Sequence, residues 1–202
     1  KAGKLLPEEH EQTTHFSVVD PSGNAVATTT TINSAYGSKV IVKGGGFFMN
    51  NEMDDFSAKP GVPNQFGLLG NEANAIEPGK RMLSSMTPTI VAKDGHWEMV
   101  VGSPGGSTII TSVFQTIVNV TEFGKTGAEA VAAPRFHHQW RPDTIFVEKE
   151  GFPADVLEGL RKKGHTVVKR GYIGAVDAIF RTKDGAIELV ADPRWDDGVA
   201  GE

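Results

Sequence analysis

The turn Asp20-Pro21-Ser22-Gly23-Asn24 separates two stretches in which β-branched residues predominate. The first stretch begins at Thr13 and reaches Val19, and the second runs from Ala25 to Thr31. β-Branched residues favour extended strands, and a short turn containing Pro, Gly and Asn joins antiparallel neighbours. The sequence therefore predicts a hairpin that begins at Thr13, and with it a fold built on an antiparallel sheet.

Strands and helices follow this hairpin in runs rather than in strict alternation. We expect a strand at residues 46–49, a hairpin of strands 89–92 and 97–101, and helices at 107–123 and 126–133. The remainder predicts strands at 145–147 and 166–168, a helix at 154–163, and a final hairpin through 178–180 and 189–190. This order indicates an α+β fold in which helices cover a sheet or a pair of sheets.

The stretch from Lys59 to Gly70 contains two prolines, three glycines and few charges. It is too long to be a simple connector between neighbouring strands. Loops of this kind are usually either disordered or functional, so we expect a disordered segment or a lid over a site.

Composition restricts the class of protein and its partners. The 202 residues fit one domain, and 20 basic against 25 acidic residues give a net charge of -5, so nucleic acid is not an expected partner. Cysteine is absent, which excludes disulfides, thiolate metal sites and a cysteine nucleophile. No apolar run approaches the roughly 20 residues that a membrane-spanning helix needs. Residues 1–12 are polar and predict an exposed tail or connector.

The glycine-rich turn from Gly102 to Gly106 joins a predicted strand to a predicted helix. Free N–H groups at such a position can face an anion. The turn lacks the Gly-Lys-Ser/Thr ending of a phosphate loop and the spacing of a dinucleotide-binding loop. Two interpretations remain open, a tight turn that needs glycine conformations and an oxyanion hole made of adjacent backbone donors.

Two polar clusters offer further chemistry. Glu52, Asp54 and Asp55 follow the strand expected at 46–49, so at least two of them should lie near a sheet edge. There they could hold an ammonium group or a metal, or form only a solvated turn. Ser84-Ser85 precede a strand and could bind a carboxylate, but they lack the Gly-x-Ser-x-Gly context of a hydrolase nucleophile.

His137-His138 suggest a metal ligand or a general base. Adjacent residues do not share a face of a helix or a strand, and the sequence supplies too few further ligands nearby. We therefore expect structural roles for both histidines and no metal site.

Four ordered motifs together resemble the small subunit of γ-glutamyltransferases. They are TTHFSVVD from Thr13, NNEMDDF from Asn50, KRMLSSMTPT from Lys80 and GSPGG from Gly102. The likeness continues through PRFHHQW from Pro134 to DPR from Asp192, which is nearly the whole chain. The resemblance implies an N-terminal nucleophile hydrolase of αββα architecture, of which this chain is the small-subunit half.

The same resemblance implies a precursor that cuts itself before a threonine. That bond is Gln12–Thr13 here, so residues 1–12 would be a remnant of the upstream segment and residues 13–202 the catalytic small subunit. A freed α-amino group has a pKa of about 7.7–8.0 and can act as the base for its own hydroxyl. No cofactor, metal or catalytic histidine is then needed.

The family's catalytic residues match four positions. Thr13 would be the nucleophile and Thr31 its hydrogen-bond partner, while Gly105 and Gly106 would donate backbone N–H groups to the oxyanion. The donor would be glutathione or another γ-glutamyl compound, whose γ-glutamyl group passes to Thr13 as an ester. Water, or the amine of an amino acid or peptide, would release it.

The family's substrate-binding residues match five further positions. Asn33, Glu52 and Asp55 would hold the α-ammonium of the glutamyl group, and Ser84 and Ser85 its carboxylate. A ligand without the α-amino group would leave the acids unpaired, at roughly 1–3 kcal/mol per buried polar group.

The sequence departs from its resembled relatives in the lid, which matches Pro60 to Asn71. Those relatives have a tyrosine that hydrogen-bonds the asparagine matching Asn33, whereas this sequence has Phe66, whose ring cannot make that bond. We therefore expect a more loosely latched lid.

The resemblance also implies a large subunit from the same precursor, which would supply an arginine for the substrate carboxylate and half of the shared core. Relatives suggest a periplasmic or secreted location. Two alternatives stay open: an acylase or polyglutamate-processing hydrolase of the same fold, and a noncatalytic domain that binds amino acids or assembles with a partner.

Overall fold

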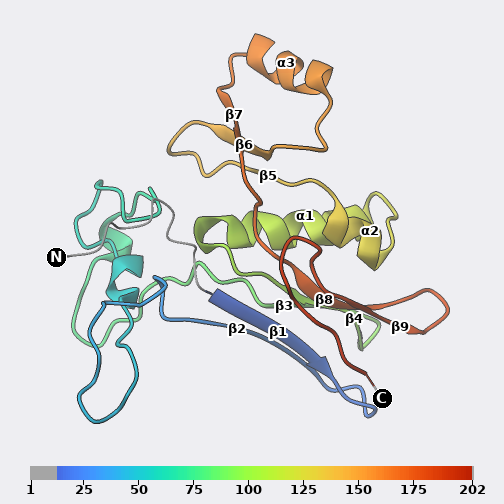
Figure 1. The fold of residues 1–202 in the computed structure, drawn as a ribbon, viewed down its shortest axis with the longest axis horizontal. Helices are drawn as coiled ribbons and strands as arrows, with labels where there is room; N and C mark the ends of the chain where they lie inside the picture. The colour runs from blue at the N-terminus through green and yellow to red at the C-terminus, as the bar shows by residue number, and fades with distance from the viewer. Residues whose placement is uncertain (1–12, 202) are drawn as a thin grey trace.

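Three sheets form the framework of this computed structural model, which describes residues 13–201 (Figure 1). A ribbon of β1 and β2 packs on a four-stranded sheet of order β3-β4-β8-β9, and a smaller sheet has the order β5-β6-β7. The ribbon and the four-stranded sheet are antiparallel throughout, as expected, whereas β6 and β7 run parallel. The strands are β1 (Thr13–Val19), β2 (Ala25–Thr31), β3 (Thr89–Lys93), β4 (His96–Gly102), β5 (Phe136–His137), β6 (Ile145–Glu148), β7 (Val167–Arg170), β8 (Asp177–Arg181) and β9 (Ile187–Val190).

The predicted first hairpin is confirmed. Thr13 pairs with Thr31 and Val19 with Ala25, with no register shift between them. At the turn, Asp20 accepts hydrogen bonds from the backbone and the side chain of Asn24 through its carboxylate. The tail expected at residues 1–12 lies outside the described residues.

The four-stranded sheet buries both of its faces. One face packs on helices through apolar side chains that include Met99, Val101 and Phe180. The other face packs on the ribbon through Trp97, Val100 and Ile179. A bulge opposite Val91/Ala92 puts Trp97 on the ribbon side, because the extra residue reverses the alternation of β4.

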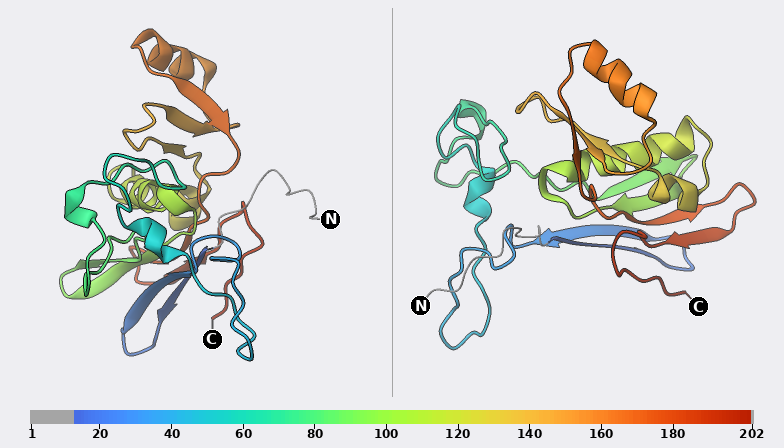
Figure 2. Two further views of the ribbon diagram at one scale, coloured as in Figure 1. Left: turned by 90° about the vertical axis from the view of Figure 1, so that its left-hand side faces the viewer. Right: turned by 45° about the horizontal axis from the view of Figure 1, so that its top comes forward.

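Helices α1 (Ile109–Thr121) and α2 (Gly127–Ala132) cover the face of the sheet away from the ribbon (Figure 2). A capping box between Thr126 and Glu129 starts α2, as the sequence Thr-x-x-Glu favours. Helix α3 (Ala154–Lys162) and the β5-β6-β7 sheet lie beyond α1, on its side away from the four-stranded sheet (Figure 1). Within residues 13–201, no helix has the length and apolar character needed to cross a membrane.

A buried charge network connects the β5-β6-β7 sheet to the main core. Arg135 and Asp192 form an ion pair of 2.7 Å, and Arg194 pairs with Glu148 at 2.7 Å. All four side chains are at least nine-tenths buried. A buried charge without a partner destabilises a fold, so the loss of one of these side chains would also leave its partner destabilising.

The prediction of a strand at residues 46–49 is wrong. The structure has only an isolated bridge between Ile41 and Phe48, and Gly44 and Gly46 take positive φ angles of 82° and 71°. Phe47 is 57% exposed, so no sheet covers the apolar run that suggested a strand. The reason is that an apolar run forms a strand only where another element pairs with it.

Residues 32–88 form one irregular region at the end of the ribbon, drawn in blue to green in Figure 1. Its only helical turns within the described chain are η1 (Glu52–Asp55) and η2 (Glu72–Asn74). This region contains the acid cluster, the predicted lid and the two serines. It therefore places all five predicted binding residues in the region that adjoins the start of β1.

Candidate active site

Thr13 lies at the first position of β1 and is only 7% exposed. Its hydroxyl donates to the Thr31 hydroxyl oxygen at 3.1 Å, across the ribbon where the two residues are paired. The backbone N–H of Asn33 donates to the same Thr31 oxygen at 2.9 Å. The hydrogen bond expected between Thr31 and Thr13 is thus present, and Thr31 is itself held by the chain that follows it.

The contacts of β1 with β4 progress towards the glycine turn. The Ser17 hydroxyl donates to the carbonyl of Val100 at 3.2 Å, and the ring of His15 occupies the space that a Cβ at Gly102 would need. Ser17 therefore lies over Val100, and His15 lies over Gly102 at the end of β4. Thr13 is the next inward residue of β1, so the same progression extends towards the Gly105–Gly106 turn.

Gly105 and Gly106 have φ angles of 134° and 53°, which favour glycine strongly. The carbonyl of Gly105 accepts from the Thr108 hydroxyl at 2.8 Å and from its N–H at 3.0 Å. Within residues 13–201, the N–H groups of the two glycines form no hydrogen bond. The turn leads through η3 (Gly106–Thr108) into α1, so both donors are at a helix start, where an anion is stabilised.

A cavity of about 590 Å³ joins Thr31, the hydrogen-bond partner of Thr13, to the predicted binding residues. Its lining includes Thr31, Glu52, Asp55 and Ser84. A second cavity of about 150 Å³ is lined by Asp55 and Ser85 together with residues of the 60–71 loop. The structure therefore brings together predicted residues that are up to about fifty positions apart in the sequence.

Two of the three acids on η1, Glu52 and Asp55, are poorly solvated. Burial, with the charge of Asp55, raises the pKa of Glu52 to about 7, and burial together with the charge of Asp54 raises the pKa of Asp55. Glu52 Oε1 is buried and has no hydrogen-bond partner within the described chain. A cationic group in this cavity would favour the ionised acids and supply the missing partner.

The expected position of Glu52 and Asp55, at a sheet edge after a strand, is wrong. Both acids lie in a turn of the irregular region. Asn51 organises that turn, since its carbonyl accepts from the Asn33 side chain at 3.1 Å and its own side chain accepts from the N–H of Ser34 at 3.0 Å. Asn33 takes a positive φ of 75°, a conformation that asparagine tolerates better than most residues. Asn33 thus links Thr31 to the acid turn.

Sequence reasoning missed Asn74. Its side chain donates to the carbonyl of Asp55 at 2.7 Å and accepts from the N–H of Leu83 at 3.0 Å, next to Ser84. It therefore fixes the spacing between the acids and the serines. Asparagine side chains mimic backbone groups in turns, which is the only signal in the sequence that indicates such a role.

Phe66 lies at the tip of the 60–71 loop, which is compact rather than extended. The Asn64 side chain accepts from the N–H groups of Phe66 and Leu68, both at 3.0 Å, and Pro63 bridges to Leu69. The phenyl ring makes no hydrogen bond to Asn33. Gln65 contacts the neighbouring residue instead, since its side chain accepts from the Ser34 hydroxyl at 3.1 Å.

The histidines have structural surroundings. Burial lowers the pKa of His137, whose ring contacts Thr111 and Gln139, while His138 lies 3.1 Å from Asp143 at the surface. Burial also lowers the pKa of His15 to about 4. In the part of the chain that is described, no group of three or more acids and histidines is arranged to hold a metal.

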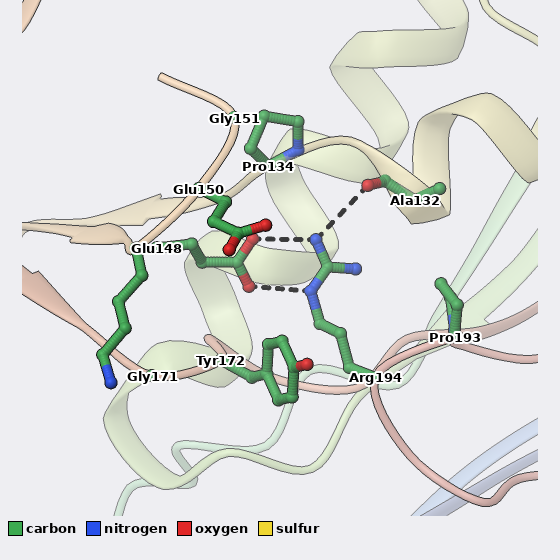
Figure 3. Close-up of a pocket in the computed structure, with 10 residues that line it drawn as sticks. Ala132, Pro134, Glu148, Glu150, Gly151, Gly171, Tyr172, Pro193 and Arg194 are labelled. Atoms are coloured by element: carbon green, nitrogen blue, oxygen red, sulfur yellow. Dashed lines mark hydrogen bonds and ion pairs between the residues drawn. The ribbon is translucent and has the colours of Figure 1, made fainter. Parts of the chain in front are cut away.

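Figure 3 shows another cavity, of about 710 Å³, that contains none of the predicted site residues. Arg194 pairs with both carboxylate oxygens of Glu148, at 2.7 and 2.8 Å. Its remaining N–H groups donate to the carbonyls of Val131 and Ala133 and to Asp192. Because all its donors are used within the fold, this arginine supports the structure and offers nothing to a ligand.

The layers of sheet and helix, with a threonine starting a strand beside a glycine turn, form the α+β fold of N-terminal nucleophile hydrolases. A solved structure of a Helicobacter pylori γ-glutamyltranspeptidase mutant superimposes with a TM-score of 0.86 and 53% identity, over 90% of this chain and 100% of that one. The γ-glutamyltranspeptidase family profile matches residues 2–202. This chain belongs to the γ-glutamyltranspeptidase family.

Two curated relatives have the same level of similarity. The glutathione hydrolase proenzyme of Escherichia coli K12 is 53% identical over 202 residues, which is 100% of this chain and 35% of that protein. The glutathione hydrolase proenzyme of Pseudomonas aeruginosa is 53% identical over 189 residues, covering 92% of this chain and 34% of that protein. The chain thus spans about a third of the length of these relatives.

Proposed function

We propose that the protein containing this chain hydrolyses glutathione and other γ-glutamyl compounds and transfers their γ-glutamyl group to amines. One observation supports this above all: the hydroxyl of Thr13 lies 3.1 Å from that of Thr31 at the first position of β1, a strand whose Ser17 and His15 contact β4 in order towards the Gly105–Gly106 turn. The names of the two proenzyme relatives support the same reaction class.

Activation is proposed to need cleavage of the Gln12–Thr13 bond. Gln12 lies outside the described residues, and the segment 1–12 would be left over from the upstream part of a precursor. Cleavage gives Thr13 a free α-amino group, whose pKa of about 7.7–8.0 lets it accept the proton of the Thr13 hydroxyl near neutral pH. Residues 13–202 would then be the catalytic small subunit.

The Thr13 oxygen attacks the γ-amide carbonyl of the donor while the amine takes its proton. The resulting oxyanion accepts hydrogen bonds from the N–H groups of Gly105 and Gly106. When the C–N bond breaks, the proton passes to the leaving amine and a γ-glutamyl ester remains on Thr13. Water or an acceptor amine attacks this ester by the reverse proton path, which restores the hydroxyl.

Recognition is proposed to use the two cavities. The buried, unpartnered oxygen of Glu52 and the neighbouring Asp55 suit the donor's α-ammonium, with Asn33 beside them. Ser84 and Ser85 suit the α-carboxylate. An acid whose pKa is raised to about 7 ionises readily when a cation replaces its lost hydration, so binding of the ammonium and ionisation of Glu52 assist each other.

The proposed partner is a large subunit cut from the same precursor. The outer face of the ribbon supports this, because Phe16, Val18 and Val26 are 47%, 51% and 50% exposed on a two-stranded sheet. We also propose a periplasmic or secreted location, which cell fractionation with an antibody against this chain would check.

Replacement of the nucleophile tests the reaction. In the complete protein, Thr13→Ala should neither cleave at Gln12–Thr13 nor release p-nitroaniline from γ-glutamyl-p-nitroanilide, while Thr13→Ser should retain part of both activities. Circular dichroism and thermal unfolding would check that both variants fold. Normal turnover by the folded Thr13→Ala variant would show that another group is the nucleophile.

A further inference from the structure

The 60–71 loop rests on a turn from a distant part of the chain. Gln139 Nε2 donates to the carbonyl of Phe66 at 3.0 Å. At Gly67, where φ is 74°, a Cβ would stand 3.5 Å from the same nitrogen and 3.8 Å from Pro142. The tip of the loop therefore contacts Gln139 through its backbone, whatever side chain is present at position 66.

The orientation of the Gln139 amide is determined by its partners. Its nitrogen donates to two carbonyls, those of Phe66 and Arg141, both at 3.0 Å. Its oxygen therefore faces His137 Nε2, at 2.8 Å, and that ring nitrogen must carry the hydrogen. Exchanging the amide's oxygen and nitrogen would set oxygen against two carbonyl oxygens.

The histidine behind Gln139 is fixed in turn. His137 is 2% exposed, and its Nδ1 lies 2.8 Å from the hydroxyl of Thr111 on the first turn of α1. This turn of the helix directly follows η3, which begins at Gly106. A continuous set of hydrogen bonds thus runs from the helix behind the glycine turn to the tip of the loop.

The opposite side of the loop contacts the proposed glutamyl site. The N–H of Gln65 donates to the carboxylate of Asp54 at 3.2 Å, and its side chain accepts from Ser34. These partners are the sequence neighbours of Asp55 and Asn33. The loop also lines the cavity that contains Asp55 and Ser85. A shift of the loop tip would therefore disturb the residues proposed to hold the substrate.

We propose that Gln139, oriented by His137, is a positioning residue that holds the 60–71 loop over the glutamyl site. Its effect on turnover rests on the proposed function, whereas its effect on the loop does not. Since Phe66 has no hydroxyl with which to latch the loop, the backbone contact from Gln139 replaces part of that restraint.

The test compares Gln139→Leu and the near-isosteric Gln139→Glu with Gln115→Leu in the complete protein. Gln115 is a matched control, because its side chain joins α1 to the backbone of Phe136, the neighbour of His137 on β5, and its hydrogen bonds within residues 13–201 involve no residue of the loop. Hydrogen exchange of the amides of residues 61–70 reports the loop, and KM and kcat for a γ-glutamyl donor report the site.

Both Gln139 variants should speed exchange in the loop and raise donor KM by roughly fivefold to tenfold, the usual effect of one partly buried hydrogen bond, with kcat within about twofold. Gln115→Leu should change neither quantity. Unchanged loop exchange in Gln139→Glu would overturn the proposal, and so would faster exchange with an unaltered KM. Absence of γ-glutamyl turnover in the unsubstituted protein would instead contradict the proposed function, while the exchange measurement would still decide whether Gln139 holds the loop.

Discussion

The two sides of the candidate active site are built by different means. The reaction side, which comprises Thr13, Thr31, Gly105 and Gly106, lies on paired strands and at the start of a helix. The recognition side, which comprises Asn33, Glu52, Asp55, Ser84 and Ser85, belongs to a region with almost no regular structure. Asparagine side chains bonded to backbone groups determine its shape, above all Asn51, Asn64 and Asn74.

Substitutions on the two sides should therefore change different kinetic constants. Groups on the reaction side are positioned by the paired strands of the ribbon, which packs on the four-stranded sheet, and by the start of a helix, so substitutions there should lower kcat for every donor. Groups on the recognition side are positioned by a few local hydrogen bonds, so substitutions there should mainly raise KM. The effect should depend on whether the donor has an α-amino group.

The largest effect is expected at the glycine turn. In Gly105→Ala, the new Cβ would stand 2.6 Å from Thr108 Oγ1 and 3.1 Å from Gly174 Cα, in a backbone with a φ of 134°. The turn must shift, and loss of one aligned oxyanion donor typically lowers kcat by ~10²–10³-fold. Steady-state kinetics would measure kcat.

Gly23→Ala is the control, since φ there is 86° but the Cβ meets nothing within 4 Å. An equal loss of kcat in both variants would contradict displacement of the Gly105–Gly106 turn as the cause.

The acid turn should show a selective effect. Asp55→Asn keeps the backbone carbonyl that accepts from Asn74 but removes a charge from the cavity. KM for a γ-glutamyl donor should rise by roughly 5- to 150-fold, from the 1–3 kcal/mol of an unpaired buried polar group. A donor without the α-amino group serves as the control and should be almost unaffected. Equal losses for both donors would assign Asp55 to the reaction side instead.

Binding of L-glutamate should depend on pH through Glu52. Burial and the charge of Asp55 raise its pKa to about 7, so the carboxyl is protonated below that pH and ionised above it. Affinity for the ammonium ligand should therefore fall as pH drops from 7.5 to 5.5, by up to about tenfold per pH unit below the pKa. Calorimetric titration would show this slope. In Glu52→Gln it should be clearly reduced, and an unchanged slope would exclude Glu52 as the titrating group.

The smallest effect is expected at the loop tip. Phe66→Tyr adds a hydroxyl that could reach Asn33, and one added hydrogen bond contributes about 0.5–1.5 kcal/mol. Donor KM should fall by roughly twofold to tenfold, and amide exchange in residues 61–70 should slow. If affinity and loop order both stay unchanged, the expectation of a loosely latched lid is wrong.

The sequence predicted the reaction side better than the recognition side. The hairpin at Thr13 follows from β-branched residues around a turn, and the helix after the glycine turn from the spacing of Ile109, Val113 and Ile117, which are local patterns. The strand expected at residues 46–49 was wrong because pairing depends on partners elsewhere. The bridges made by Asn74 and Gln139 join residues up to 73 positions apart, and no local pattern indicates them.

Thr13 is proposed to become an amino-terminal nucleophile next to the glycine turn. The most direct measurement is mass spectrometry of the complete protein after reaction with an electrophilic glutamine analogue, followed by peptide mapping. We predict a fragment that begins at Thr13 and carries one adduct on that residue. An adduct on another residue, or inactivation of a chain still intact at Gln12–Thr13, would contradict the account.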